Sequence, residues 1–172
     1  MRTLQLFISI VLLVGAHGSS KASEAYPATQ TTQASAGLLT PDEVAIRQAI
    51  EGYANGFIQK DMQLLLGLWD TVNPNEVTYV AVELPQPIVG VTHLQPYYQS
   101  FLNSPLIVQS GDISDLRIVQ TGDTAYAFCT YTWVYDVSGS TLVQPTRATF
   151  VLVKRNGHWL YQHFHESILF ES

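Results

Sequence analysis

Two histidines near the C-terminus are the residues whose type and spacing most suggest chemistry. In the segment 158–167 (HWLYQHFHES), the alternation of a β-strand places every second side chain from Trp159 to Ser167 on one face, including His163 and His165. Their side chains then lie about 7 Å apart. Because imidazole exchanges a proton near neutral pH, both histidines are candidates for weak acid–base groups lining a pocket.

A metal site at this pair would need a third ligand at a suitable spacing. The remaining histidines, His17, His93 and His158, provide none, and Cys129 is the only cysteine. Cys129 falls inside a predicted strand with no histidine at motif spacing, which indicates a packing role. The sequence also has no phosphate-binding glycine loop and no nucleophile elbow. We therefore expect neither a metal nor a cofactor.

Proton transfer at a carbon or an epoxide would need a carboxylate inside an apolar cavity, because burial raises its pKa toward neutral pH. Glu83, Asp70 and Asp112 are the carboxylates whose positions allow this. None belongs to a paired-carboxylate motif. The catalytic candidates are thus His163 or His165 together with Glu83 or Asp70, and the sequence does not establish that catalysis occurs.

Arg147 lies among small and apolar neighbours in a predicted strand, where a guanidinium needs a partner or a ligand anion. The Asn156-Gly157 hairpin signal pairs residues whose numbers sum to about 313. This register places Arg147 opposite Glu166 and beside His165. Two interpretations follow, a pocket residue that binds an anion and a cross-strand salt bridge to Glu166.

The elements that must position these residues are helices followed by long strands. Thr40 to Glu43 form a capping-box signal, and the apolar stripe behind it predicts a helix to about residue 60. Asp61 caps a shorter helix that ends before residue 73. The pattern also predicts a helix over 92–102 and strands over 76–84, 106–120, 124–136, 142–155 and 158–170. Helices followed by an antiparallel meander indicate the α+β class.

The N-terminal part of the chain reads as an export signal. Arg2 precedes an apolar run, Leu4–Val14, which predicts a signal peptide in residues 1–25, cleaved after residue 18 or 25. The run is too short for a permanent membrane helix. The composition of residues 26–39 predicts a flexible tether, and that of residues 40–172 predicts a single folded domain. We expect a secreted or periplasmic protein without stable membrane insertion after cleavage.

Composition limits the partners of this domain. The lone cysteine leaves no intrachain disulfide, and after residue 25 the chain keeps 6 basic against 13 acidic residues. This excess argues against nucleic acid or an anionic membrane. The strand over 124–136 is apolar on both faces, which predicts a homodimer through the sheet. Surface aromatic residues are the alternative explanation.

Three stretches resemble the SnoaL-like branch of the nuclear transport factor 2-like superfamily, and most of all the association domain of calcium/calmodulin-dependent protein kinase II. They are Asp42-Glu43-Val44 with its helix, Ile88-Val89-Gly90 leading to Tyr97-Tyr98, and Thr146-Arg147 through Gly157 and Trp159 to His163–Ser167. The resemblance implies a cone of N-terminal helices packed on a curved antiparallel sheet, with a pocket open at one end and frequent sheet-to-sheet dimers. Members include ketosteroid isomerase, scytalone dehydratase and limonene epoxide hydrolase, besides binding and assembly domains without chemistry.

The resemblance also carries two residue-level implications. The pocket of the kinase association domain is rich in arginine; Arg147 matches one of those positions, whereas Thr130 stands at another. A strongly anionic ligand is therefore less expected here. The isomerase pattern of a pocket tyrosine with a paired aspartate is not recovered, because Tyr53, Tyr79 and Tyr97 have no positionally matched acid.

The sequence favours an exported, homodimeric pocket domain that binds a small, partly apolar molecule, with no assigned chemistry. The residues expected to line the pocket are Tyr53, Trp69, Tyr97, Arg147, His163 and His165. Two alternatives stay open. One is an isomerase, dehydratase or hydrolase of the ketosteroid isomerase-like type, with a pocket histidine and a carboxylate. The other is a pure oligomerisation module.

Overall fold

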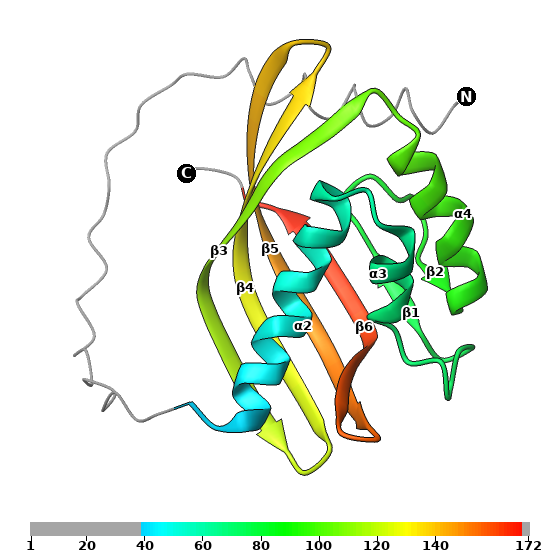
Figure 1. The fold of residues 1–172 in the computed structure, drawn as a ribbon, viewed down its shortest axis with the longest axis vertical. Helices are drawn as coiled ribbons and strands as arrows, with labels where there is room; N and C mark the ends of the chain where they lie inside the picture. The colour runs from blue at the N-terminus through cyan, green and yellow to red at the C-terminus, as the bar shows by residue number, and fades with distance from the viewer. Residues whose placement is uncertain (1–38, 170–172) are drawn as a thin grey trace, which may run out of the picture.

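Residues 39–169 are described by the computed structural model, and they form helices packed on one face of a six-stranded mixed sheet (Figure 1). The helices are α2 (Pro41–Ile58), α3 (Met62–Gly67) and α4 (Val91–Leu102), and the strands are β1 (Thr78–Val80), β2 (Ile88–Val89), β3 (Leu106–Thr121), β4 (Thr124–Val137), β5 (Ser140–Arg155) and β6 (His158–Ile168). The strand order is β2-β1-β6-β5-β4-β3. The predicted α+β class is confirmed, while the predicted signal peptide and almost all of the tether lie outside the described residues.

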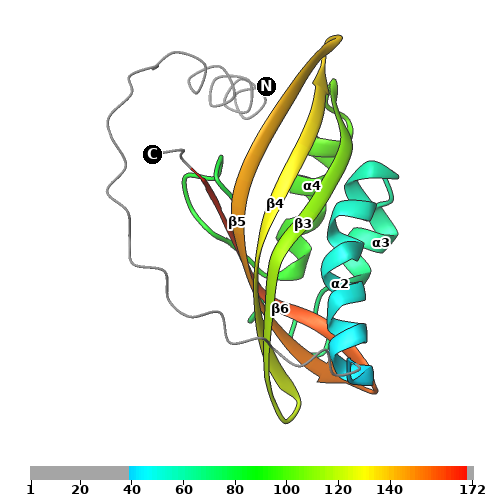
Figure 2. The ribbon, with the colours of Figure 1, turned by 90° about the vertical axis from the view of Figure 1, so that its left-hand side faces the viewer.

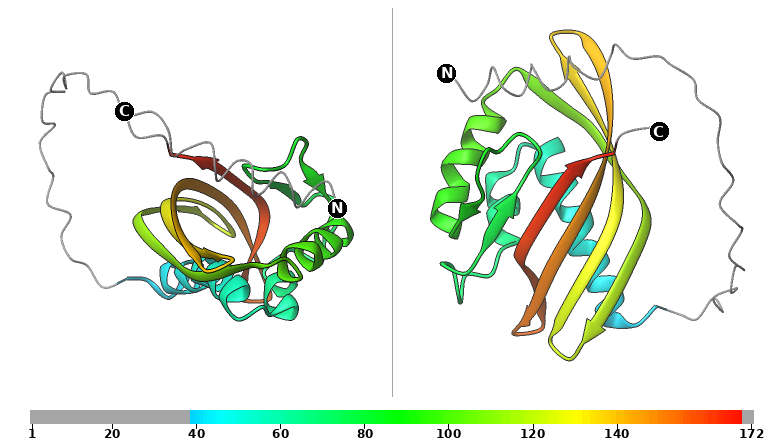
Figure 3. Two further views of the ribbon diagram at one scale, coloured as in Figure 1. Left: turned by 90° about the horizontal axis from the view of Figure 1, so that it is seen from above. Right: turned by 180° about the vertical axis from the view of Figure 1, so that it is seen from behind.

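The long strands curve around the helices. Figure 2 shows β3, β4 and β5 bending past α2 and α4, and the left view of Figure 3 shows the sheet curling over them. From behind, in the right view of Figure 3, the strands lie in front of α2 with no described helix over them. The sheet therefore has an inner face covered by helices and an uncovered outer face.

The sheet is mixed because β1 pairs in parallel with β6, while the other pairings are antiparallel. The expected strand over 76–84 is reduced to Thr78–Val80. Residues 81–84 instead form a turn, closed by the Leu84 amide donating to the Ala81 carbonyl oxygen at 3.1 Å. This turn places Glu83 beside the interior rather than on a strand.

The start of α2 follows its sequence signal. The Thr40 amide donates to Glu43 Oε2 at 2.7 Å and the Glu43 amide donates to Thr40 Oγ1 at 3.2 Å, which completes the predicted capping box. The apolar stripe of this helix is buried against the sheet. Its members are Ile46, Ile50, Tyr53 and Phe57.

Asp42 fixes the first turn of α2 to the ends of three strands. Its carboxylate accepts hydrogen bonds from Lys154 Nζ at 2.6 Å, Trp159 Nε1 at 3.0 Å and Gln120 Nε2 at 3.0 Å. The bond from Lys154, followed by those from Trp159 and Gln120, lowers the pKa of Asp42 to about 2. The helix that covers the inner face is thus held at its N-terminal end by an ionised carboxylate.

An extra residue in β6 changes the face to which its side chains point. Tyr161 pairs with Leu152 and His163 pairs with Val151, so Gln162 is a β-bulge. Beyond it, Arg147 pairs with Ser167 rather than with Glu166. The predicted register, and with it the predicted common face from 159 to 167, is wrong in this half of the strand. A one-residue slip moves each later side chain to the opposite face.

Gly111 of β3 lies in a crowded position between Trp133 of β4 and Ala54 of α2. A Cβ atom at Gly111 would lie 2.5 Å from Cζ3 of Trp133 and 2.9 Å from Cβ of Ala54. We expect Gly111→Ala to lower the free energy of unfolding by about 1–3 kcal/mol, because the added methyl overpacks this contact. Gly67→Ala is the matched control, since its Cβ would meet nothing within 4 Å. Urea denaturation of both variants measures the difference, and equal stabilities would contradict the close approach.

Candidate functional site

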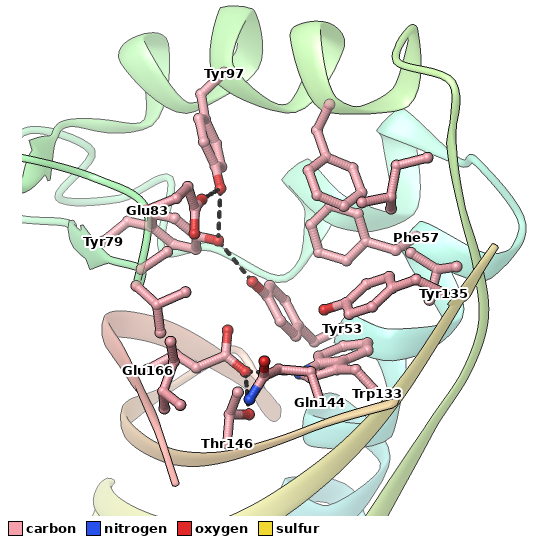
Figure 4. A pocket seen from close by; sticks show the side chains of 16 residues that line it. Tyr53, Phe57, Tyr79, Glu83, Tyr97, Trp133, Tyr135, Gln144, Thr146 and Glu166 are labelled. Carbon is pink, nitrogen blue, oxygen red and sulfur yellow. Dashed lines mark hydrogen bonds between the residues drawn. The ribbon is translucent and has the colours of Figure 1, made fainter. Parts of the chain in front are cut away.

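A cavity opens between α2, α4 and the inner face of the sheet (Figure 4). The empty space between the lining side chains is about 700 Å³, a value that includes open solvent at the mouth. Its lining consists of Tyr53, Phe57, Tyr79, Ala81, Val82, Glu83, Tyr97, Phe101, Leu106, Val108, Trp133, Tyr135, Gln144, Thr146, Glu166 and Ile168. Most of these side chains are aromatic or aliphatic, so the site offers mainly apolar contact.

The aromatic wall is built from the helices α2 and α4 and the strands β1 and β4. Tyr53 meets Phe57 edge to face on α2, with ring centroids 5.0 Å apart. Trp133 and Tyr135 project from β4 with parallel rings whose centroids are 6.2 Å apart. Tyr97 extends from α4 at the top of Figure 4, across the cavity from Trp133. Rings that pack on one another in this way form a wall with few free rotamers.

Glu166 enters the cavity from β6 because of the bulge at Gln162. Its Oε1 accepts hydrogen bonds from Trp133 Nε1 at 2.7 Å and from Thr146 Oγ1 at 2.5 Å. Burial raises the pKa of Glu166 to about 7, against the lowering effect of those two hydrogen bonds, and the Glu83 carboxylate raises it further. Near neutral pH this carboxyl is divided between its protonated and ionised forms.

The second oxygen of Glu166 faces the open space. Within residues 39–169, both hydrogen bonds to this side chain go to Oε1. No buried side-chain nitrogen or oxygen in the described part of the chain lacks a partner. Oε2 therefore keeps some exposed surface, and Figure 4 shows a carboxyl oxygen of Glu166 pointing into the cavity.

Glu83 is the second carboxyl of the cavity and has only 6% of its surface exposed. Its Oε1 accepts a hydrogen bond from the Tyr97 hydroxyl. Burial raises the pKa of Glu83, although that hydrogen bond opposes the shift. Tyr97 thus has an acidic partner, which the isomerase pattern sought in the sequence did not reveal.

A chain of tyrosine hydroxyls leads away from Glu83. The hydroxyl oxygens of Tyr97 and Tyr79 are 3.4 Å apart, and those of Tyr79 and Tyr53 are 2.7 Å apart (Figure 4). Burial raises the pKa of all three phenols. They stay protonated at physiological pH and can donate hydrogen bonds toward Glu83 or toward a ligand.

Of the expected pocket residues, Tyr53 and Tyr97 line this cavity, as does the carboxylate candidate Glu83. Trp69 is buried outside the lining and donates from Nε1 to the Tyr98 hydroxyl at 3.1 Å. Asp70, 0% exposed, accepts hydrogen bonds from Arg155 at 3.0 and 3.3 Å.

Asp70 keeps its charge through these contacts. Although burial by itself raises the pKa of Asp70, hydrogen bonds from Arg155 and the Val72 amide lower it below its ordinary value. Asp70 is therefore an ion-pair residue that ties β5 to the segment after α3. It lies outside the cavity lining, so the pairing of Asp70 with a pocket histidine is not formed.

The expected polar corner of Arg147, His163 and His165 lies outside the cavity lining. His163 Nδ1 lies 2.7 Å from Thr78 Oγ1, and burial, then the charge of His165, lowers the pKa of His163. His165 is exposed, and Arg147 donates from its guanidinium to the Ile168 carbonyl oxygen at 3.4 Å. The bulge explains this placement, because it carries the two histidines to the outer face and brings Glu166 inside.

Sequence reasoning missed Glu166, Trp133 and Tyr135 as cavity residues. One signal was present. The apolar side chains of β6 are spaced by two at Trp159 and Tyr161 but by three between Tyr161 and Phe164, which marks a break in strand alternation. Asp112, the third carboxylate candidate, is exposed on β3 and accepts a hydrogen bond from Ser110 at 3.1 Å.

The described residues contain no group of three or more histidine, cysteine, aspartate or glutamate side chains placed to hold a metal ion. Over the same residues, none of the helices has the length and apolar character needed to cross a membrane.

Glu166 makes stability depend on pH in a predictable direction. Its native pKa of about 7 exceeds the ordinary value of 4.5, so the folded state binds the proton more tightly. This stabilisation is fully present below pH 4.5 and is lost as pH rises through about 7. The loss is on the order of 3 kcal/mol. Glu166→Gln should remove it, as urea denaturation between about pH 5 and pH 8 would measure.

Glu76→Gln is the control, because Glu76 is exposed and does not line the cavity. This variant should keep the pH slope of the native chain. If the free energy of unfolding of Glu166→Gln changed with pH as steeply as that of the native chain, the raised pKa of Glu166 would be refuted.

Comparison with solved structures shows the same fold in proteins of low identity. One is a nuclear transport factor 2-like protein from Streptomyces avermitilis with a provisional assignment as a dehydratase (21% identity, TM-score 0.66, 76% of this chain and 98% of that chain). A second, from Thiobacillus denitrificans, is provisionally assigned as a calcium/calmodulin-dependent protein kinase type II association domain (14% identity, TM-score 0.60, 76% of this chain and 95% of that chain). A third, from Novosphingobium aromaticivorans, is provisionally assigned as an aromatic ring hydroxylase (14% identity, TM-score 0.64, 77% of this chain and 94% of that chain).

No curated protein sequence matches the chain. The nuclear transport factor 2-like fold expected from the sequence is nevertheless confirmed by these structures. The sequence also matches the SnoaL-like domain over residues 46–171, which is most of its length. The chain therefore belongs to the SnoaL-like domain family.

Proposed function

We propose that this protein binds a small, largely apolar molecule in the cavity between α2, α4 and the sheet. The observation that carries the proposal is a wall of aromatic rings with few polar side chains, among them the two carboxyl groups of Glu83 and Glu166. Ligand sites commonly combine an apolar lining with a few polar groups that fix orientation. Membership of the SnoaL-like family, whose fold commonly encloses a pocket, is consistent with this role.

The polar groups of the cavity are already ordered before a ligand enters. Trp133 and Thr146 hold Glu166 through Oε1, and Tyr97 holds Glu83. A ligand would therefore meet fixed hydrogen-bonding positions rather than mobile side chains. Such preorganisation lowers the entropy that binding must offset.

Two matched substitutions on β3 test the binding site. Val108 is buried in the lining, whereas Val119 is 46% exposed on the same strand. Val108→Phe should fill the cavity and abolish binding, whereas Val119→Phe should leave it intact. The measurement is a thermal shift with neutral molecules such as 4-ethylphenol, naphthalene and cyclohexanone. A ligand at 100 times its Kd adds about 2.7 kcal/mol of stability.

If a ligand raised the melting temperatures of Val108→Phe and Val119→Phe equally, its binding site would lie outside this cavity. The absence of any shift in the native chain with these neutral molecules and with small amines alike would contradict the proposal itself.

A second candidate function is proton transfer in the same cavity. The favouring observation is that the pKa of Glu166 is raised to about 7, which suits a general acid or base at physiological pH. In this version Glu166 takes the role assigned to a pocket histidine in the sequence-based hypothesis. The Tyr97 hydroxyl, which donates to Glu83 in the structure, would instead donate to an oxygen atom of the substrate. One solved structure of similar fold carries a provisional dehydratase assignment.

A benzisoxazole probe reports directly on such a base. Removal of the ring C–H proton from 5-nitrobenzisoxazole transfers the proton to the base, breaks the N–O bond and releases a coloured cyanophenolate. The rate should rise as pH passes through about 7 and fall by about a hundredfold in Glu166→Gln. Glu76→Gln should match the native chain. An unchanged rate in Glu166→Gln would exclude Glu166 as the base.

Export and dimerisation remain part of the proposal. The support for dimerisation is the uncovered outer face of the sheet, where Tyr126 is 52% and Val143 is 56% exposed. Light scattering of the purified chain tests self-association, and also the alternative of a pure oligomerisation module. Export to a secreted or periplasmic location is supported by the apolar run near the N-terminus, and N-terminal sequencing of exported protein tests it.

A further inference from the structure

The charged groups of the cavity are all of one sign. Its lining contains two carboxyl side chains, Glu83 and Glu166, and no lysine, arginine or histidine. The two are close enough for the charge of Glu83 to raise the pKa of Glu166. In the view of Figure 4 both carboxyl groups lie on the left side of the cavity, facing the rings of Phe57, Trp133 and Tyr135.

The basic side chains of residues 39–169 all lie outside the cavity lining. They are Arg47, Lys60, Arg117, Arg147, Lys154 and Arg155, and none lines the cavity. Lys154 pairs with Asp42 at 2.6 Å and Arg155 pairs with Asp70 at 3.0 Å. The described part of the protein therefore supplies no positive charge to balance the cavity carboxyls. A buried charge is normally paired.

We propose that the cavity selects small amines in their ammonium form over neutral and anionic molecules of the same shape. This inference rests on the proposed binding function and names the ligand class for that site. The ammonium group would donate to the accessible Oε2 of Glu166. The hydrocarbon part of the ligand would lie against Trp133 and Tyr135.

The aromatic lining supports a cation as well as an apolar body. Ring faces attract a cation within about 6 Å of the centroid, and tryptophan does so most strongly. Trp133 Nε1 donates to Glu166 in the plane of the indole, so the carboxyl that would receive the ammonium lies at the edge of this ring. One ligand could therefore place its ammonium at Oε2 of Glu166 and its hydrocarbon part against the rings of the lining.

An anionic ligand would meet the opposite situation. Its charge would lie beside two carboxyls, without a cation in the lining to offset it. The position that resembles the arginine-rich pocket of the kinase association domain, Arg147, is exposed outside the lining, and its pairing partner across the strands is Thr130. The side chain that could have attracted an anion is thus absent from the cavity.

Four ligands that share a phenyl ring and a short chain separate the charge classes. They are 2-phenylethylamine, 2-phenylethyltrimethylammonium, 2-phenylethanol and 3-phenylpropanoate, each titrated into the full domain at pH 7.5 by calorimetry. We expect 2-phenylethylamine to bind at least tenfold more tightly than the alcohol and at least a hundredfold more tightly than the acid. We expect 2-phenylethyltrimethylammonium, which is charged but has no N–H to donate, also to bind more tightly than the alcohol. This result would show that the positive charge favours binding without a hydrogen bond.

Conservative variants connect the preference to the two carboxyls. Glu166→Gln and Glu83→Gln should each weaken 2-phenylethylamine by tenfold or more and change 2-phenylethanol by less than threefold. Glu76→Gln, on the exposed surface, should change neither. Two glutamine variants keep the test decisive if one of them does not fold.

The outcomes separate this inference from the function on which it rests. Equal or tighter binding of the alcohol or the acid, abolished by Val108→Phe, would overturn the amine preference and leave the binding function standing. Absence of binding by all four ligands and by the neutral panel would overturn both. An amine preference retained in both glutamine variants would overturn the assignment to Glu83 and Glu166.

Discussion

The pairing of β6 with β5 skips Gln162, and the contents of the cavity depend on this single bulge. Without it, strand alternation would direct His163 and His165 inward and Glu166 outward. With it, Phe164 joins the buried core and Glu166 reaches the cavity lining. The bulge therefore replaces imidazoles with a carboxyl in the interior and changes both the charge and the proton affinity of the site. Bulges are common beside functional sites, where they redirect a side chain in this way.

The cavity keeps polar groups in a part of the fold where apolar residues would be more stable. Glu166 is held by Trp133 and Thr146, and Tyr97 holds Glu83, so every buried polar side-chain atom in residues 39–169 has a partner. The hydrogen bonds offset part of the desolvation, but the raised pKa of both carboxyls shows that burial dominates. A domain without disulfides keeps such groups at the expense of stability, which is expected where they serve a ligand.

Much of the fold could be predicted because its signals are local. The capping box at Thr40 and Glu43 is a short-range pattern, and the Asn156-Gly157 turn needs the positive φ values, 50° and 84°, that those residues tolerate. The site could not be predicted in the same way. The inward position of Glu166 requires a bulge that only the partner strand fixes, and Glu83 reaches the cavity because a predicted strand ends early as a turn. Both facts depend on tertiary contacts rather than on periodicity.

The register of β6 also limits which roles of pocket residues can be transferred to this chain from proteins of similar fold. The solved structures that resemble this chain share its backbone at 14–21% identity, and a shared backbone does not fix the sign of the charge in the pocket. Arg147, which the resemblance in sequence implied as a pocket residue, is exposed and bonds to the Ile168 carbonyl oxygen. The interior contains Glu83 and Glu166 without a basic neighbour in the lining. Electrostatics therefore separates this cavity from an arginine-rich one within the same fold, and ligands should be sought by their charge before their shape.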